Sequence, residues 1–256
     1  MYDAIILAGG QNAEPLRQVS AQPYEAMIDI AGKPMVTFVA EALAACPQVG
    51  RIFVVGPARE LANCALPPSA VVVEGGRTIV ETISRGMAAL GHEHKVLVVT
   101  ADIPLLTPEA IQDFLAQCSR VEADLYYPIV RREYNERYYP GTKRTYVRFR
   151  EGTYTGGNIF LVNPAIVPRC MAVAERIIAN RKNPFKLCCL LGWNFVFKFI
   201  FGRLTLAEVE KRVAAMLGIT GAVIESRYPE LGIDVDKPSD LEMVRSMVSM
   251  SMKYEV

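Results

Sequence analysis

The stretch YDAIILAGG, from Tyr2 to Gly10, decides the fold class of this sequence. The apolar run Ala4–Leu7 predicts a buried β-strand, and the glycines that follow Ala8 predict a tight loop at its carboxyl end. Glycines let backbone N–H groups approach a phosphate closely, because no Cβ stands in the way. The same pattern also occurs in α/β domains without a phosphate site, and the loop matches neither GxxxxGK[ST] nor GxGxxG.

Outward from this stretch, apolar runs of strand length alternate with segments of helical period. This alternation is typical of a parallel sheet covered by helices. Strands are expected at Ala4–Leu7, Arg51–Val55, Ala70–Val73, Lys95–Val99 and Asp124–Val130. Helices are expected at Pro34–Ala45, Glu60–Cys64, Arg77–Leu90 and Pro108–Cys118, followed later by Leu204–Ile219 and by a helix that begins near Pro238. The pattern indicates an α/β protein.

Composition and charge bound the protein further. With 256 residues, 51% of them hydrophobic, the chain can form one large domain, residues 1–256. Its 28 basic residues balance 27 acidic ones, which gives no reason to expect a nucleic-acid partner. Met1 leads straight into the first strand without the pattern of a signal peptide, so we expect a cytoplasmic protein. The six cysteines lack CxxC spacing, and His92 and His94 are interpreted as a polar turn.

Carboxylates follow two strand-like segments. In TADIPLLTPEAI, Asp102 comes directly after the strand Lys95–Val99, at the end of the sheet where α/β proteins bind ligands. In GIDVDKPSDLEMV, Asp234 and Asp236 are two residues apart and would share one face of a strand. Mg²⁺ prefers such carboxylates together with phosphate oxygens. We expect a magnesium site there, although Asp102 also fits a simple turn cap.

Four ordered motifs then carry a family resemblance. LAGG at Leu7–Gly10, GKPMV at Gly32–Val36, ADIPL at Ala101–Leu105 and the late DVDKPSDLE resemble the MobA-like nucleotidyltransferases. The resemblance covers Met1 to about Ser119 and returns at 156–162 and 232–243. It implies a three-layer α/β/α, Rossmann-like GT-A fold with a mostly parallel central sheet. It also implies Mg²⁺-dependent transfer of a nucleotidyl group from a nucleoside triphosphate, with GTP or CTP favoured, to a phosphorylated small molecule.

The resemblance also assigns site residues. The nucleotide would contact the glycine loop and two later segments, through Leu7, Ala8, Gly9, Gly10, Gln11, Gly76, Arg77, Thr82 and Ala101. The resemblance implies that Asp102 holds the metal, and Asp234 or Asp236 of the late acidic segment could complete that site. The acceptor would contact Gly157 and Asn158 of the segment TGGN. The glycine pairs at 75–76 and 156–157 equally fit ordinary turns.

One departure from the family pattern bears on catalysis. The family's usual lysine, seven residues before the glycine of GKPM, is replaced here by Glu25. A carboxylate cannot stabilise the leaving pyrophosphate as an ammonium group would. Either Arg17 or Lys33 compensates, or the chemistry is altered or lost. The alternatives are therefore a non-catalytic nucleotide-binding or regulatory protein and, within the same fold, a nucleotide-sugar glycosyltransferase, against which LAGG argues.

The segments outside the resemblance are harder to assign. The region from about 131 to 157 is expected to leave the sheet and to carry substrate contacts, and about 164 to 218 is expected to be a helical insertion. Within KRTYVRFR, strand alternation would place Arg144, Tyr146 and Arg148 on one face, with Arg144 as an acceptor-phosphate contact or as part of a solvated edge strand. The apolar stretch Pro184–Gly202 predicts one helix that is buried, forms a homodimer contact or lies at a membrane interface.

Overall fold

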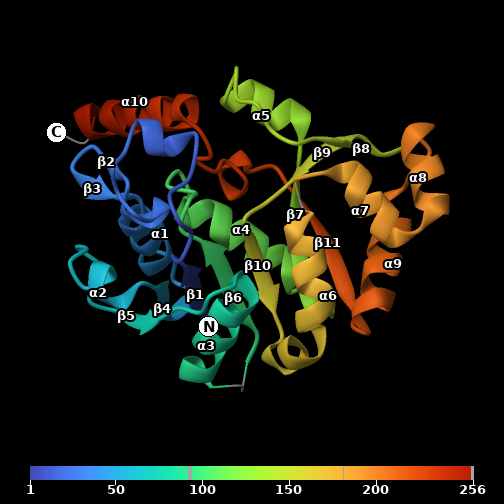
Figure 1. The fold of residues 1–256 in the computed structure, drawn as a ribbon, viewed down its shortest axis with the longest axis horizontal. Helices are drawn as coiled ribbons and strands as arrows, with labels where there is room; N and C mark the ends of the chain where they lie inside the picture. The colour runs from blue at the N-terminus through green and yellow to red at the C-terminus, as the bar shows by residue number, and fades with distance from the viewer. Residues whose placement is uncertain (92–93, 181, 255–256) are drawn as a thin grey trace.

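The structure is a computed structural model that describes residues 1–91, 94–180 and 182–254 (Figure 1). His92 of the predicted polar turn lies outside the described residues. Within them, nine strands form one mixed sheet in the order β5-β4-β1-β6-β10-β7-β9-β8, and β11 pairs with β7. The strands are β1 (Tyr2–Leu7), β4 (Val49–Gly56), β5 (Ala70–Glu74), β6 (Val96–Thr100), β7 (Leu125–Arg131), β8 (Val147–Arg148), β9 (Thr153–Gly156), β10 (Ile159–Val162) and β11 (Gly221–Ser226). The short strands β2 (Asp29–Ile30) and β3 (Lys33–Pro34) pair with each other.

The centre of the sheet is parallel and buried on both faces. Ile5 of β1 lies opposite Phe53 of β4 on one side and Val98 of β6 on the other. These strands carry nearly continuous apolar runs, as expected for strands that are covered on both faces. Beyond β6 the antiparallel strand β10 is inserted between β6 and β7. The predicted mostly parallel sheet flanked by helices is confirmed.

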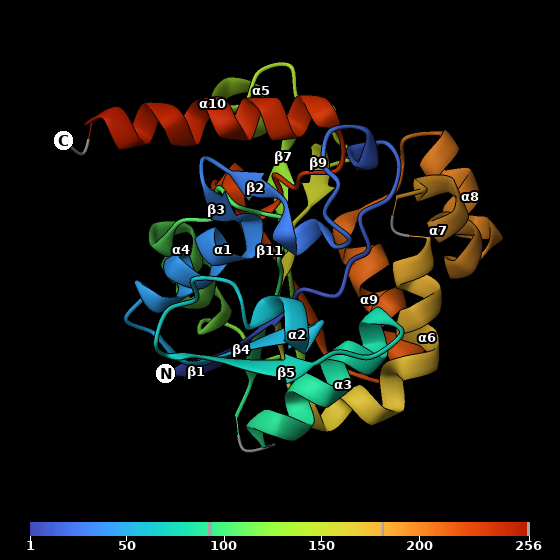
Figure 2. The same cartoon turned by 60° about the vertical axis from the view of Figure 1, so that its left-hand side comes forward.

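Helices form a layer on each face of the sheet (Figure 2). One core cluster joins α1 and α4 to one face, and a second joins α3 to the other face, where α6 packs on α3 and α9 packs on β11. The helices are α1 (Met35–Ala44), α2 (Ala58–Leu61), α3 (Ile79–Leu90), α4 (Pro108–Cys118), α5 (Arg132–Tyr138), α6 (Val167–Ala179), α7 (Pro184–Leu191), α8 (Trp193–Ile200), α9 (Leu206–Leu217) and α10 (Pro238–Tyr254). Single 3₁₀ turns lie at Leu16–Gln18, Glu25–Met27, Pro164–Ile166 and Pro229–Leu231.

Two predicted helix starts are each wrong by two residues. The helix expected from Arg77 begins at Ile79, since the Thr78 hydroxyl accepts the backbone N–H of Glu81 and ends the preceding loop. The helix expected from Glu60 begins two residues earlier, directly after Pro57. In both cases the helix itself is present.

The apolar stretch 184–202 is not one helix. Gly192 has φ +122°, a conformation that favours glycine, and it separates α7 from α8. Val196 of α8 is buried, but Trp193 and Phe201 keep 76% and 71% of their surface exposed. The buried interpretation of this segment is therefore wrong for the exposed face of α8, and the homodimer contact and the membrane interface stay predictions. None of the described helices is both long and apolar enough to cross a membrane.

The region 131–157 leaves the sheet only briefly. It forms α5 and then returns through β9, which pairs antiparallel with β7. The strand expected over KRTYVRFR is limited to Val147–Arg148, so the predicted shared face of Arg144, Tyr146 and Arg148 is not formed. Arg144 lies before the strand and is buried rather than solvated at an edge. The region 164–218 contains α6 to α9.

Candidate active site

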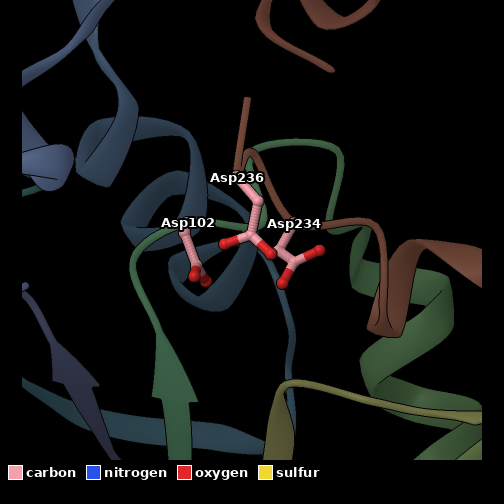
Figure 3. A group of neighbouring side chains, drawn as sticks. All are labelled: Asp102, Asp234 and Asp236. Carbon is pink, nitrogen blue, oxygen red and sulfur yellow. The ribbon is translucent and has the colours of Figure 1, made fainter. Parts of the chain in front are cut away.

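Carboxylates from distant parts of the sequence meet at the carboxyl end of β6. Oxygen atoms of Asp102, Asp234 and Asp236 lie within 4.8 Å of one another, and Figure 3 shows the side chains gathered beside the loop that follows β6. The backbone N–H of Val235 donates to the carbonyl oxygen of Asp102 at 2.9 Å, which ties the two loops together. Residues 234–236 are not a strand, so this prediction is wrong, but the side chains still converge.

Cations and a hydroxyl contact this acidic cluster. Arg144 forms an ion pair with the Asp234 carboxylate and also donates to its carbonyl oxygen at 2.7 Å. The Lys182 ammonium donates to both carboxylate oxygens of Asp236 at 2.7 Å. The Thr100 hydroxyl donates to the carboxylate of Asp102. Two protein cations thus face three carboxylates, so these cations compensate the charge of the cluster only partly.

The guanidinium of Arg144 is almost fully removed from water. Its side chain is 5% exposed, and its Nε atom has no hydrogen-bond partner among the described residues. Burial lowers the pKa of this guanidinium, although the carboxylates of Asp240, Asp236 and Asp102 act to raise it. A buried donor without a partner is costly, so an acceptor atom on a bound ligand would offset that cost.

A pocket of about 170 Å³ opens beside Asp102. Its walls come from the end of β1, the 3₁₀ turn at Glu25, the start of α3 and the end of β6. The lining residues are Leu7, Ala8, Gly9, Gly10, Glu25, Ala26, Gly76, Arg77, Thr78, Ile79, Thr82, Thr100, Ala101 and Asp102. Two of the glycine sites differ in their surroundings: a Cβ at Gly9 would meet nothing within 4 Å, whereas one at Gly10 would lie 3.0 Å from Glu25 Oε2.

The residues around the first turn of α3 shape one wall of this pocket. The Thr82 hydroxyl accepts the Gly76 N–H at 3.1 Å and donates to the Thr78 carbonyl at 2.8 Å. The Arg77 N–H is held by Glu81 Oε2 at 2.8 Å. Thr82 therefore lines the pocket while its hydroxyl supports the turn at Gly76.

Some predicted site residues lie outside this pocket. Lys33 is paired with Glu41 at 2.8 Å and lies over the ring of Phe38. Arg17 is exposed in a 3₁₀ turn, and Gln11 forms an isolated bridge with Tyr24. None of these three side chains lines the pocket as the structure describes it.

A second cavity of about 730 Å³ adjoins the first. Leu7, Ile79 and Thr100 line both, so the two spaces share a wall. The second cavity is lined by Arg144, Gly157, Asn158, Asp234 and Asp236, among others. The predicted acceptor contacts are therefore brought together with the acidic cluster, on the side away from the glycine loop.

A family model described as the MobA-like NTP transferase domain matches residues 4–185. The chain belongs to this family.

Individual proteins and solved structures are similar to this MobA-like chain. A solved structure from Thermus thermophilus, described as a hypothetical transferase, is 38% identical with a TM-score of 0.79 and covers 94% of this chain and 99% of its own. A CMP:2-keto-3-deoxy-manno-octonic acid synthetase complexed with CTP shares the fold at 14% identity, with a TM-score of 0.65 over 98% of this chain and 100% of its own. The bifunctional protein GlmU of Rhodospirillum rubrum is 34% identical over 110 residues, 42% of this chain and only 24% of that protein.

Sequence reasoning missed several residues of this candidate site. Thr78 and Ile79 line the pocket, and the helix-cap pattern of Thr78 followed by Glu81 was a signal that could have found them. Thr100 sits two residues before Asp102, at the strand end already singled out. Lys182 carried no local signal, because its partner Asp236 is 54 residues away in sequence.

Proposed function

We propose that this MobA-like protein transfers a nucleotidyl group from a nucleoside triphosphate to a phosphorylated acceptor. The observation that carries the proposal is the wall shared by the two cavities. Asp102 lines the pocket at the glycine loop, while Asp234 and Asp236 line the second cavity, yet their carboxylates lie within 4.8 Å. A donor phosphate and an acceptor phosphate bound in the two cavities would therefore meet at the acidic cluster.

In the proposed reaction, an oxygen of the acceptor phosphate attacks the α-phosphorus of the triphosphate. A new P–O bond forms there, the bond to the β-phosphate oxygen breaks, and pyrophosphate leaves with that electron pair. Such chemistry depends on positioning and on charge stabilisation more than on a protein nucleophile. Gly9 and Gly10 would present backbone N–H groups to the triphosphate, with Leu7, Ala8 and Ala101 beside them.

The acidic cluster fits Mg²⁺. Its donors are carboxylate oxygens, which suit a hard cation, and converging carboxylates repel each other unless positive charge is near them. Asp102, Asp234 and Asp236 would hold the ion, and the Thr100 hydroxyl would orient Asp102. When bound, Mg²⁺ would neutralise phosphate charge at the α-phosphoryl group. Arg144 and Asn158 would orient the acceptor.

The proposal also includes two cationic side chains that would stabilise the leaving pyrophosphate. Arg17 and Lys33 are the groups proposed to contact pyrophosphate in place of the lysine that Glu25 replaces. For Lys33 this requires its ion pair with Glu41 to open, which costs little because both partners are exposed. We further propose GTP or CTP as donor and a cytoplasmic location without a nucleic-acid partner.

One observation favours a second candidate, a non-catalytic nucleotide-binding or regulatory protein. The Glu25 carboxylate lies against Gly10 inside the nucleotide pocket, where it opposes phosphate binding by charge repulsion. Such a protein would bind a nucleotide without forming pyrophosphate.

A thermal-shift screen with CTP, GTP, ATP and UTP, each with and without Mg²⁺, tests both candidates. We expect a magnesium-dependent rise in Tm for one triphosphate, lost in Asp102→Asn and kept in Asp113→Asn, an aspartate on α4 outside the site. Pyrophosphate release with added acceptor then separates the transferase from the non-catalytic protein. The absence of any triphosphate-dependent shift in the wild type would contradict the proposal.

A further inference from the structure

The cavity of about 730 Å³ is much larger than the pocket of about 170 Å³ beside Asp102. It extends from the cluster between the sheet and the helices α6, α7 and α9. Its volume falls within the range of about 300–1,000 Å³ that encloses small-molecule ligands in proteins. The volume alone does not select a ligand class, so the selection depends on the residues that line the cavity.

Most of the cavity wall is apolar. Val98 and Phe160 line it from the sheet, and Met171, Ile178 and Leu190 line it from the helices. A ligand rich in hydroxyl groups would lose hydrogen bonds to water there without gaining partners, at a cost of about 1–3 kcal/mol for each group. A hydrocarbon chain would instead be stabilised by about 0.8 kcal/mol for each buried methylene.

The charged lining residues gather at the end that adjoins the acidic cluster. Arg144 is paired with Asp234, and Lys182 is paired with Asp236. Glu210 of α9 lies outside this group, and its carboxylate accepts a backbone N–H of β11 at 3.0 Å. The cavity thus has a charged end and an apolar body.

We propose that the acceptor is a lipid phosphate, with its apolar chain in the cavity and its phosphate at the charged end. This inference rests on the proposed function and names its acceptor class. The buried Nε of Arg144, which has no partner among the described residues, would donate to the phosphate. The attacking phosphate oxygen would then lie beside the carboxylates of Asp102, Asp234 and Asp236.

An exposed apolar face on α8 suits this acceptor. α7 lines the cavity, and α8 follows it after Gly192. Trp193, Phe197, Ile200 and Phe201 follow helical spacing along one face, and each keeps at least 59% of its surface exposed. An exposed apolar face that contains tryptophan and phenylalanine is typical of helices that lie at a lipid surface. We assign this face to the surface from which the lipid phosphate enters.

Calorimetric titration with hexyl, octyl and decyl phosphate below their micelle concentrations tests the cavity. We expect the dissociation constant to fall about fourfold for each added methylene, and decanol to bind more weakly than decyl phosphate. Equal affinity for the three chain lengths would overturn the lipid assignment. Equal affinity for decanol and decyl phosphate would overturn the assigned phosphate end.

Matched variants on one helix locate the binding. Ala174 of α6 lines the cavity, whereas Ala172 of the same helix is exposed. Ala174→Phe should weaken decyl phosphate binding at least tenfold, and Ala172→Phe should leave it unchanged. If Ala174→Phe unfolds, Ala214→Leu in the cavity and Ala215→Leu outside it give the same comparison on α9. Unchanged binding in the folded cavity variant would contradict the proposal.

Failure of the lipid assignment can be told from failure of the proposed function. The magnesium-dependent triphosphate shift should persist in Ala174→Phe, because that residue is outside the nucleotide pocket. A normal magnesium-dependent rise in Tm with triphosphate, together with an alkyl phosphate affinity that does not change with chain length, would support the transferase and contradict the lipid acceptor.

A separate experiment tests the exposed face of α8. The double variant Trp193→Ser, Phe197→Ser should lower co-sedimentation with phosphatidic acid vesicles at least fivefold. If the wild type is a dimer, the variant is a monomer and co-sedimentation with vesicles is unchanged, the face is instead a contact between two copies of the chain.

Discussion

The Lys182 ammonium lies 2.7 Å from each carboxylate oxygen of Asp236. Lys182 shortly precedes α7, which begins at Pro184, and its ammonium competes with any cation that uses Asp236 as a ligand. The pair is largely exposed, at 58% and 36% of the two side chains, so its contribution is at most about 1 kcal/mol.

Removal of this competitor should strengthen metal binding. Lys182→Met is expected to lower the Mn²⁺ or Mg²⁺ dissociation constant, measured without nucleotide, by up to about fivefold. Lys186→Met, exposed on α7 and outside the cluster, is the control and should leave metal affinity as in the wild type. An unchanged dissociation constant for Lys182→Met would contradict competition between the Lys182 ammonium and the metal ion.

The charge at position 25 should oppose triphosphate binding. Glu25→Lys is expected to tighten binding of the preferred triphosphate at least about fivefold, because a repulsion of about 1 kcal/mol or more is replaced by attraction. Glu25→Gln, which keeps an acceptor oxygen, should give a smaller gain. Glu14→Lys, an exposed change outside the pocket, controls for net charge. Equal nucleotide affinity in all three variants would place the phosphates away from Glu25.

Two glycines should respond in opposite ways to alanine. A Cβ at Gly9 meets open space in the pocket, so Gly9→Ala should weaken triphosphate binding while the free energy of unfolding stays within about 0.5 kcal/mol. A Cβ at Gly157 would lie 2.8 Å from Pro128 Cγ and 3.0 Å from the Leu231 carbonyl oxygen. Gly157→Ala should therefore lower the free energy of unfolding by about 1–3 kcal/mol. Denaturant unfolding and nucleotide titration of both variants separate the two effects.

Stability should decline in acid partly through Asp124. Its carboxylate accepts the N–H and hydroxyl of Thr220 and the amide of Asn163, and these bonds lower its pKa. A carboxyl whose pKa is lower in the folded state stabilises the fold above its unfolded pKa, near about 3.9. That contribution, about 1 kcal/mol after allowance for solvent, is lost as pH falls through the folded value.

Urea unfolding at pH 7 and pH 3 measures this term. Asp124→Asn should be less stable than the wild type at pH 7, and the difference should shrink at pH 3. A difference that is the same at both pH values would exclude a role for the Asp124 charge.

The parts of the fold that follow from local patterns were predictable. The run Ala4–Leu7 and the strand before Asp102 are apolar because both faces of the sheet are covered, and that property is visible in the sequence alone. The acidic cluster was predictable for a different local reason. Asp102 lies in the motif ADIPL, and Asp234 and Asp236 lie in the motif DVDKPSDLE. The helix over 184–202 was mispredicted because hydrophobicity does not report backbone angle, and Gly192 takes a positive φ.

The parts that depend on long-range contacts were not predictable. The pairing of Lys182 with Asp236 and of Arg144 with Asp234 requires the connections between α6 and α7 and before β8 to reach the cluster. The sequence around Lys33 does not indicate that its ammonium pairs with Glu41 and does not line the nucleotide pocket. The extent of the larger cavity depends on how α6, α7 and α9 stand off the sheet.

The hydrogen bond from Val235 to Asp102 has a consequence for biosynthesis. Asp102 leaves the ribosome long before Asp234 and Asp236, so a nascent chain that has already formed β1, β4 and β6 still lacks two carboxylates of the cluster. The glycine loop is therefore made early, whereas the cluster can close only after residue 236 has emerged. A half-made chain has the walls of a nucleotide pocket without the metal site proposed to act on the nucleotide.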